Sequence, residues 1–119
     1  MDYRVIGKSG RNYIRLNPTG HLIMMESDAL ELLSACAENS TNLLLIPGER
    51  LSDEFFRLGT GLAGSILQKF ALYGIKFAVL LDQDAEQGRF REFLIESNRG
   101  NAFRSFSNVE EAESWLLNQ

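Results

Sequence analysis

Two short, wholly apolar runs constrain the fold of this 119-residue chain more than any other feature. Residues 43–46 read Leu-Leu-Leu-Ile and residues 77–81 read Phe-Ala-Val-Leu-Leu, and turn-forming or polar residues follow each run at once. Short apolar runs between such breakers are typical of strands buried on both faces. The segment between the two runs is long enough to hold a helix. The sequence therefore predicts two neighbouring inner strands, parallel to each other and joined by a helical crossover.

The rest of the chain supplies the other elements of an α/β fold. Residues 3–7 and 12–16 alternate in polarity around a Ser-Gly turn, which predicts a β-hairpin. Another helix is expected at about 88–97, and a half-polar edge strand at 102–106. The predicted order is β-β-α-β-α-β-α-β-α. We expect one domain over residues 1–119, with helices packed on a mixed sheet of about five strands.

Capping residues predict where the helices begin. Ser27, Thr60 and Ser107 each precede a stretch of helical apolar spacing, and Ser52 precedes a shorter helical turn. Gly74 is expected to end the helix that Thr60 opens. The buried stripe of that helix is expected to comprise Leu62, Ile66, Phe70 and Tyr73.

Composition limits the class of protein. A net charge of −4 at pH 7 provides no basic field, which argues against nucleic-acid and membrane-surface binding. No apolar run approaches the ~20 residues that span a bilayer, and the first residues lack the features of a signal peptide. Cys36 is the only cysteine, so no internal disulfide can form, and its place in a helical apolar pattern predicts a buried side chain. We therefore expect a cytoplasmic protein.

Residues 59–64, Gly-Thr-Gly-Leu-Ala-Gly, match the spacing of the dinucleotide-binding fingerprint G-x-G-x-x-G. Asp82, after the next apolar run, stands where such a fold places the acid that binds the ribose hydroxyls. The fingerprint requires a buried strand that leads directly into Gly59, whereas residues 52–58 are largely polar and acidic. We therefore favour small residues that let the helix approach the sheet closely. A nucleotide-binding protein or small enzyme that uses residues 59–64 and Asp82 is the alternative.

From residue 43 to residue 81 the chain resembles the STAS domains, the fold of sulfate transporters and anti-sigma-factor antagonists. In those domains an apolar strand leads through a loop to a Ser/Thr-Gly-Leu sequence, which opens a helix that runs into another apolar strand. Residues 60–62, Thr-Gly-Leu, are the matching sequence here. The Glu-Ala pair at 111–112 and the Trp-Leu pair at 115–116 are similar to the end of STAS-like bacterial domains. The resemblance implies a STAS-like fold and a regulatory role.

Longer stretches are similar to a small bacterial family known only as a domain of unknown function. They cover residues 55–64, 67–70 and 96–100. In anti-sigma-factor antagonists a partner kinase phosphorylates the hydroxyl at the helix opening, so the STAS resemblance implies Thr60 as a switch or phosphorylation site. This chain departs from the antagonist pattern, because Leu58 and Gly59 stand where the antagonists carry Asp and Ser. A helix-capping role for Thr60 is the competing interpretation.

The carboxyl ends of the predicted strands are where open α/β sheets bind ligands. Acids in these loops could bind a cation or act in acid–base catalysis, but solvated loop acids are commoner, so we predict no catalytic residue, no metal and no cofactor. His21 has no second histidine or paired cysteine with which to form a zinc site. Besides Thr60, the candidate surface comprises Glu49, Phe55, Phe56, Gly59, Gly61, Asp82 and Asp84. For Phe55 and Phe56, packing of both rings in the core is the alternative, and the commoner outcome for large aromatic side chains. We expect a non-enzymatic bacterial regulatory or interaction module that binds a protein partner or small ligand there. A homo-oligomer is also compatible with the sequence.

Overall fold

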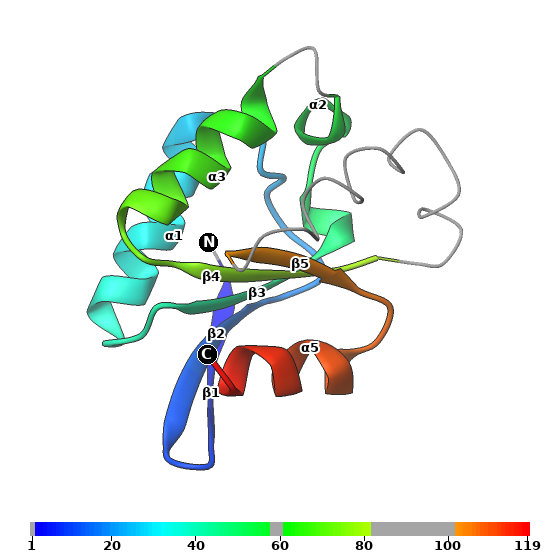
Figure 1. Cartoon of the computed structure of the whole chain (residues 1–119). Helices are drawn as coiled ribbons and strands as arrows, with labels where there is room; N and C mark the ends of the chain where they lie inside the picture. The colour runs from blue at the N-terminus through cyan, green and yellow to red at the C-terminus, as the bar shows by residue number, and fades with distance from the viewer. Residues whose placement is uncertain (1, 58–60, 82–101) are drawn as a thin grey trace.

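A computed structural model describes residues 2–57, 61–81 and 102–119 of the chain (Figure 1). The strands are β1 (Tyr3–Lys8), β2 (Arg11–Leu16), β3 (Leu43–Pro47), β4 (Lys76–Leu80) and β5 (Phe103–Phe106). The helices are α1 (Glu26–Glu38), the 3-10 turn η1 (Gly48–Arg50), α2 (Asp53–Phe56), α3 (Leu62–Leu72) and α5 (Val109–Leu117). The helix expected at 88–97 lies outside the described residues.

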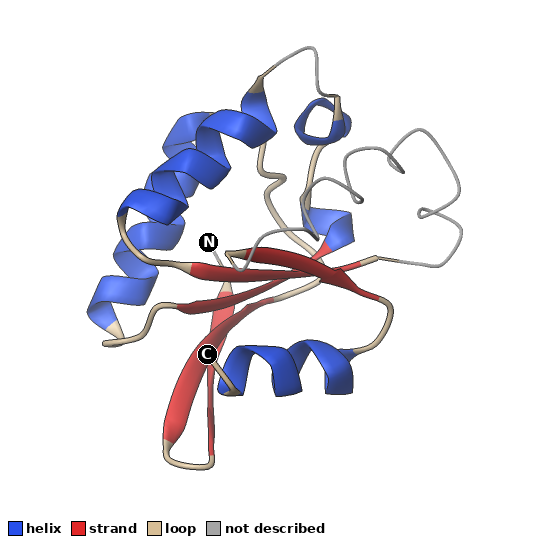
Figure 2. Ribbon diagram, viewed as in Figure 1, coloured by secondary structure: helices blue, strands red, loops and turns tan. Residues whose placement is uncertain are grey.

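The five described strands form one mixed sheet in the order β1-β2-β3-β4-β5 (Figure 2). β1 and β2 are antiparallel and form the predicted hairpin, while the other neighbouring pairs are parallel. Leu44 of β3 lies opposite Phe77 of β4, and α3 is the crossover that connects these two strands. The α/β fold, the two inner strands and the edge strand at 102–106 are thus confirmed.

Helices cover both faces of the sheet. Figure 1 shows α1 and α3 over one face and α5 across the other. Successive residues of β3 serve the two sides in turn, since Leu44 and Ile46 belong to the core under α1 and α3, and Leu43 and Leu45 to the core under α5. A strand that packs against helices on both faces has no side for polar residues, which explains the unbroken apolar run.

Three of the predicted helix starts are wrong by one or two positions. α1 begins at Glu26 rather than after Ser27, and α5 follows Asn108 rather than Ser107. The Asn108 side-chain oxygen accepts a hydrogen bond of 2.9 Å from the Glu111 N–H. Asn108 therefore caps α5 in place of the Ser107 hydroxyl. α3 begins at Leu62, with Gly61 rather than Thr60 as its N-cap residue.

Other local predictions fare better. Ser52 caps α2 as expected, since its hydroxyl accepts from the Phe55 N–H at 3.3 Å. Ile66 and Phe70 of the α3 stripe are buried. Tyr73 is not part of that stripe, because it is the C-cap residue of α3 and its side chain is 67% exposed. Gly74, at φ +69°, turns the chain toward β4 as predicted.

A polar network ties α5 to the hairpin. The Glu113 carboxylate accepts one hydrogen bond from the Lys8 ammonium at 2.7 Å and another from the Tyr13 hydroxyl at 2.6 Å. The Arg11 guanidinium donates to the backbone carbonyls of Leu117 and Gln119. The hydrogen bond from Lys8, followed by that from Tyr13, holds the pKa of Glu113 below its ordinary value.

This network predicts a loss of stability in acid. The folded state lowers the pKa of Glu113. The contribution of Glu113 to the free energy of unfolding is therefore complete above the pKa of the unfolded chain, about 4.3, and is lost as the pH falls through the lower pKa of the folded state. We expect urea unfolding between pH 7 and pH 3 to show a smaller acid loss in Glu113→Gln than in the wild type. Glu38→Gln, an exposed acid on α1, is the matched control and should follow the wild type. Equal acid loss in both variants would contradict a role for Glu113.

Candidate functional site

Two loops meet at the carboxyl edge of the sheet, which is the side where the parallel strands β2, β3 and β4 end. Residues 17–25 connect β2 to α1, and residues 48–57 follow β3. Ile23 and Leu51 form a parallel bridge between the loops, in which the Ile23 N–H donates to the Arg50 carbonyl at 2.7 Å and the Ser52 N–H donates to the Ile23 carbonyl at 3.3 Å. These backbone bonds continue the β2–β3 pairing beyond the sheet and join the two loops into one platform.

Arg50 holds this platform together from inside. Its side chain is only 1% exposed and is the largest that is fully buried in the described residues. Nε donates to the His21 carbonyl at 2.8 Å, and Nη1 donates to the carbonyls of Asn17 at 2.8 Å and Thr19 at 3.2 Å. A Cβ at position 20 would lie 3.1 Å from Cζ of Arg50, so Gly20 lets the loop close over the guanidinium.

Backbone carbonyl dipoles, and no anion, accept the hydrogen bonds of this buried cation among the residues that the structure describes. In the described part of the chain no carboxylate pairs with Arg50, and its second terminal nitrogen, Nη2, is buried without a hydrogen-bond partner. Arg50 cannot be recognised as buried from the sequence, because an arginine after a strand gives no local signal of burial. Long cationic side chains are almost never fully buried.

Asp28 organises the other end of the 17–25 loop. The carboxyl group is buried, and its Oδ2 accepts from the N–H groups of Met24 at 2.9 Å and Met25 at 3.1 Å. Its Oδ1 lies 3.0 Å from Nε2 of the exposed His21. Asp28, instead of Ser27, thus satisfies donors at the start of α1, where a negative charge also suits the helix dipole.

The predicted surface residues do not all lie at the surface. Glu49 in η1 is exposed, and so is Gly61 at the start of α3. Phe55 is fully buried in the core under α1 and α3, so it is not part of the candidate surface, and the core-packing alternative is confirmed for this residue. Because α2 directs Phe55 inward, it anchors the 48–57 loop instead. The other predicted positions, which are the side chain of Phe56 and residues Gly59, Thr60, Asp82 and Asp84, lie outside the described residues.

The structural context of the glycine-rich motif differs from that of a dinucleotide-binding fold. β3 ends at Pro47, and residues 53–56 form α2, with Arg57 as its C-cap. The fingerprint requires a sheet strand that runs directly into its first glycine, so that the phosphates meet the helix N-terminus. A helix occupies the place of that strand here. The packing role that we favour for the small residues is wrong for Gly61 and Gly64, because both are exposed and a Cβ at either position would meet no described atom within 4 Å. Ala63 alone of the described small residues of the motif is buried.

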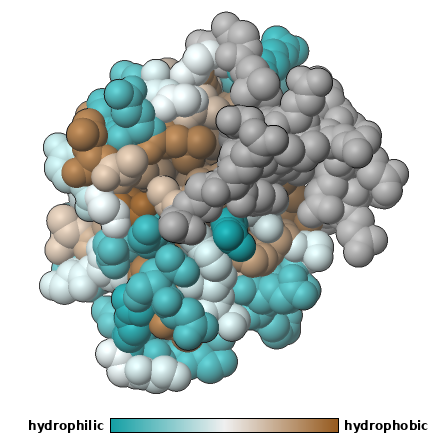
Figure 3. All heavy atoms as spheres, viewed as in Figure 1, coloured by the Kyte–Doolittle hydropathy of each residue, from teal (hydrophilic) through white to brown (hydrophobic). Residues whose placement is uncertain are grey.

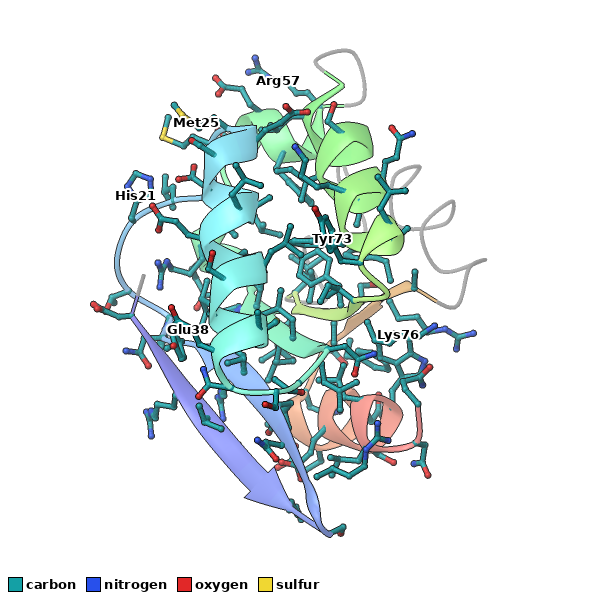
Figure 4. The ribbon with its side chains drawn as sticks, turned by 90° about the vertical axis from the view of Figure 1, so that its left-hand side faces the viewer. His21, Met25, Glu38, Arg57, Tyr73 and Lys76 are labelled. Carbon is teal, nitrogen blue, oxygen red and sulfur yellow. The ribbon has the colours of Figure 1, made fainter. Side chains whose placement is uncertain are left out.

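An apolar patch lies at this edge that sequence analysis missed. It consists of Leu22, Met24 and Met25, which are 39%, 45% and 57% exposed, and we call it the methionine edge. Figure 4 shows Met25 and Arg57 at the same end of the molecule, where α1 and α3 begin. In the sequence, residues 22–25 are only a short apolar connector before the helix. Since the backbone N–H groups of Met24 and Met25 donate hydrogen bonds to Asp28, the platform holds this apolar segment at the surface.

A second apolar region lies away from this edge. Hydrophobic atoms reach the surface over α1 and α3 in Figure 3. Between α1 and the end of α3 there is a groove of about 390 Å³, whose lining includes Leu30, Leu33, Cys36 and Tyr73. Burial raises the pKa of the Cys36 thiol to about 11, which keeps it protonated and unreactive at neutral pH. Cys36 therefore behaves as the small buried hydrophobe that was predicted.

The described residues also limit other chemistry. Among them, no group of three or more His, Cys, Asp or Glu side chains is placed to hold a metal ion. No helix in these segments is long and apolar enough to cross a membrane.

The fold and its edge platform define a small α/β domain with a mixed five-stranded sheet. The family model described as "Domain of unknown function (DUF4180)" matches residues 8–116, so the chain belongs to this family. Predicted membership in a family of unknown function is thereby confirmed. No curated protein and no solved structure matches the chain.

Proposed function

We propose that this protein is a non-enzymatic bacterial regulatory module that binds a protein partner through the carboxyl edge of its sheet. The methionine edge carries the proposal. Three apolar side chains stand exposed together on a loop that Arg50 and Asp28 hold in one conformation. Contiguous exposed apolar side chains mark interaction surfaces, and binding residues commonly lie on loops that a rigid scaffold positions.

A STAS-like mode of action fits the order of elements. The inner strand β3, the loop that follows it, the Thr-Gly-Leu sequence, α3 and β4 succeed one another as in STAS domains. In the antagonists of that family, binding to a partner is controlled at the helix opening. Gly61 is exposed there, beside Thr60 in the chain. A phosphate on Thr60 would add about −1.5 to −2 charges beside Gly61 in the chain, and added charge of this size can create or disrupt protein contacts.

The chemistry of the edge indicates what the partner offers. Methionine is flexible and polarizable, so it adapts to apolar partners of different shapes. Two exposed acids belong to the same end of the sheet, since Glu26 follows Met25 as the first residue of α1 and Glu49 lies in η1 of the 48–57 loop. We therefore propose a partner segment that carries apolar side chains together with Lys or Arg. Such a segment would bury the methionines and meet complementary charge at the rim.

The test is a binding assay with matched surface variants. Partners are captured on the immobilised protein, identified, and titrated against purified variants. Met24→Glu/Met25→Glu should lower the affinity at least about tenfold, since it replaces the apolar contact with repelled or desolvated charge. Leu72→Glu is the control, because Leu72 is 78% exposed at the far end of α3 and should leave the affinity unchanged. In the same assay, Thr60→Glu should weaken binding if Thr60 is the switch.

Two outcomes would contradict the proposal. Equal loss of affinity in the methionine and Leu72 variants would show that the contact is not at this edge. A rise in the melting temperature with NAD or ATP, abolished by Gly61→Val, would favour the nucleotide-binding alternative. The melting temperature of each variant without ligand shows whether the fold has survived the substitution.

A further inference from the structure

We propose that the free edge of β1 pairs with β1 of a second copy of this chain, so that two sheets join in antiparallel fashion. β1 is the first strand in the sheet order, and among the described residues only β2 pairs with it. Figure 4 shows β1 as the outermost strand of the molecule. An unpaired strand edge is a template for pairing with another strand.

The hairpin determines which backbone groups of β1 face outward. Its turn, Ser9-Gly10, has two residues, so the closing pair of Lys8 and Arg11 is a hydrogen-bonded pair, and every second pair is bonded likewise. The Asn17 N–H donates to the Asp2 carbonyl at 3.1 Å, as this alternation requires. The even-numbered residues of β1 therefore face β2. The outward groups belong to Tyr3, Val5 and Gly7.

One register of a two-fold pair uses all three outward residues. Centred on Val5, it places Val5 opposite the partner's Val5 and Tyr3 opposite the partner's Gly7, so that each pair can exchange both N–H···O bonds. Centring the pair on Arg4 would place two arginines opposite each other. Centring it on Ile6 would place Arg4 opposite Lys8 and would lose the pair made by Tyr3. Like charges directly opposite each other destabilise a sheet.

Side chains are complementary in the register centred on Val5. Asp2 lies opposite the partner's Lys8 on both sides of the two-fold axis. That ammonium donates one hydrogen bond to Glu113 of its own chain and has two further N–H donors. Arg4 lies opposite the uncharged Ile6. Val5, which is 44% exposed in the monomer, would face its own copy. Charge complementarity and the number of backbone bonds together point to a second copy as the occupant of this edge, and the short interface implies a weak dimer.

Sedimentation equilibrium of the whole chain up to millimolar concentration tests the dimer. We expect a reversible monomer–dimer equilibrium in the wild type and in Val5→Thr, which keeps a β-branched, uncharged side chain. Val5→Lys should raise the dissociation constant of the dimer at least about tenfold, because two ammonium groups then face each other. Both substitutions change an exposed side chain and leave the β1–β2 backbone bonds intact. A wild type that stays monomeric over the whole range overturns the proposal.

Cysteine cross-linking tests the register. Opposed residues have Cα atoms about 5.5 Å apart, within disulfide range, so V5C should oxidise to a covalent dimer. G7C is the matched control, because the two substituted positions would lie about 13 Å apart in this register. A side chain fits at position 7, where a Cβ would meet no atom within 4 Å, and the native Cys36 is buried. Cross-linking of G7C in preference to V5C overturns the proposed register.

Discussion

Arg50→Ala should lower the free energy of unfolding by about 3 kcal/mol. The substitution removes the largest fully buried side chain and leaves a cavity beside the loop platform. It also removes the donors of three backbone carbonyls, those of Asn17, Thr19 and His21. Buried acceptors without donors and an unfilled cavity each destabilise, and relief from burying a cation offsets only part of the loss. Urea unfolding followed by circular dichroism measures the change.

Two further variants separate the causes of this loss. Arg50→Met keeps much of the volume and lacks donors, so it should be less destabilising than Arg50→Ala by the cavity contribution. Arg50→Lys keeps a charge and three donors on a smaller head group. Its free energy of unfolding should fall between those of Arg50→Met and the wild type. Hydrogen exchange of the Ile23 amide, which bonds to the Arg50 carbonyl, should accelerate in Arg50→Ala. A loss below about 0.5 kcal/mol, as in a surface substitution, would contradict a central role for Arg50.

Phe55→Ala should lower the free energy of unfolding by about 3 to 4 kcal/mol. The ring is fully buried in the core under α1 and α3, although α2, which bears it, is a single helical turn between two loops. Loss of the ring removes the main apolar anchor of the 48–57 loop. Phe55→Leu should recover most of the stability, because leucine refills much of the space.

A matched surface variant distinguishes the core role of Phe55 from a role in the candidate surface. Glu49→Gln, on the exposed turn of the same loop, should change the free energy of unfolding by less than about 0.5 kcal/mol. If Phe55 contributed to a partner surface, its substitution would weaken binding and leave unfolding nearly unchanged. Because the ring is buried, we expect the opposite result: Phe55→Ala lowers the free energy of unfolding.

The sheet could be predicted because its signals are local and strong. The runs at 43–46 and 77–81 are apolar throughout, since helices cover both of their faces, and the Ser-Gly turn lies between two alternating strands. Helix starts were less certain, because several polar residues near each start can cap. Asp28 and Asn108 capped where Ser27 and Ser107 were expected, and tertiary packing decided between neighbours.

The candidate site was harder to predict, because its residues are defined by long-range contacts. Arg50 is buried by a loop some thirty positions earlier in the chain, and its carbonyl partners could be any backbone groups. The pair Phe55-Phe56 shows apolar character, but the direction of each ring depends on how α2 sits over the core. Met24 and Met25 gave no pattern at all. Their exposure follows from the capping of α1 by a buried carboxylate, which only the folded chain reveals.

The attachment of α5 to the hairpin bears on how the chain reaches its native state during synthesis. Glu113 and Lys8 are 105 positions apart, so their bond joins two segments that the ribosome makes far apart in time. Until residues 109–117 have left the ribosome, the sheet face formed by Tyr13, Leu43, Leu45 and Ala78 has no cover from Ala112 and Leu116. A nascent chain that stalls before α5 would expose this apolar face, and it would then bind chaperones or aggregate.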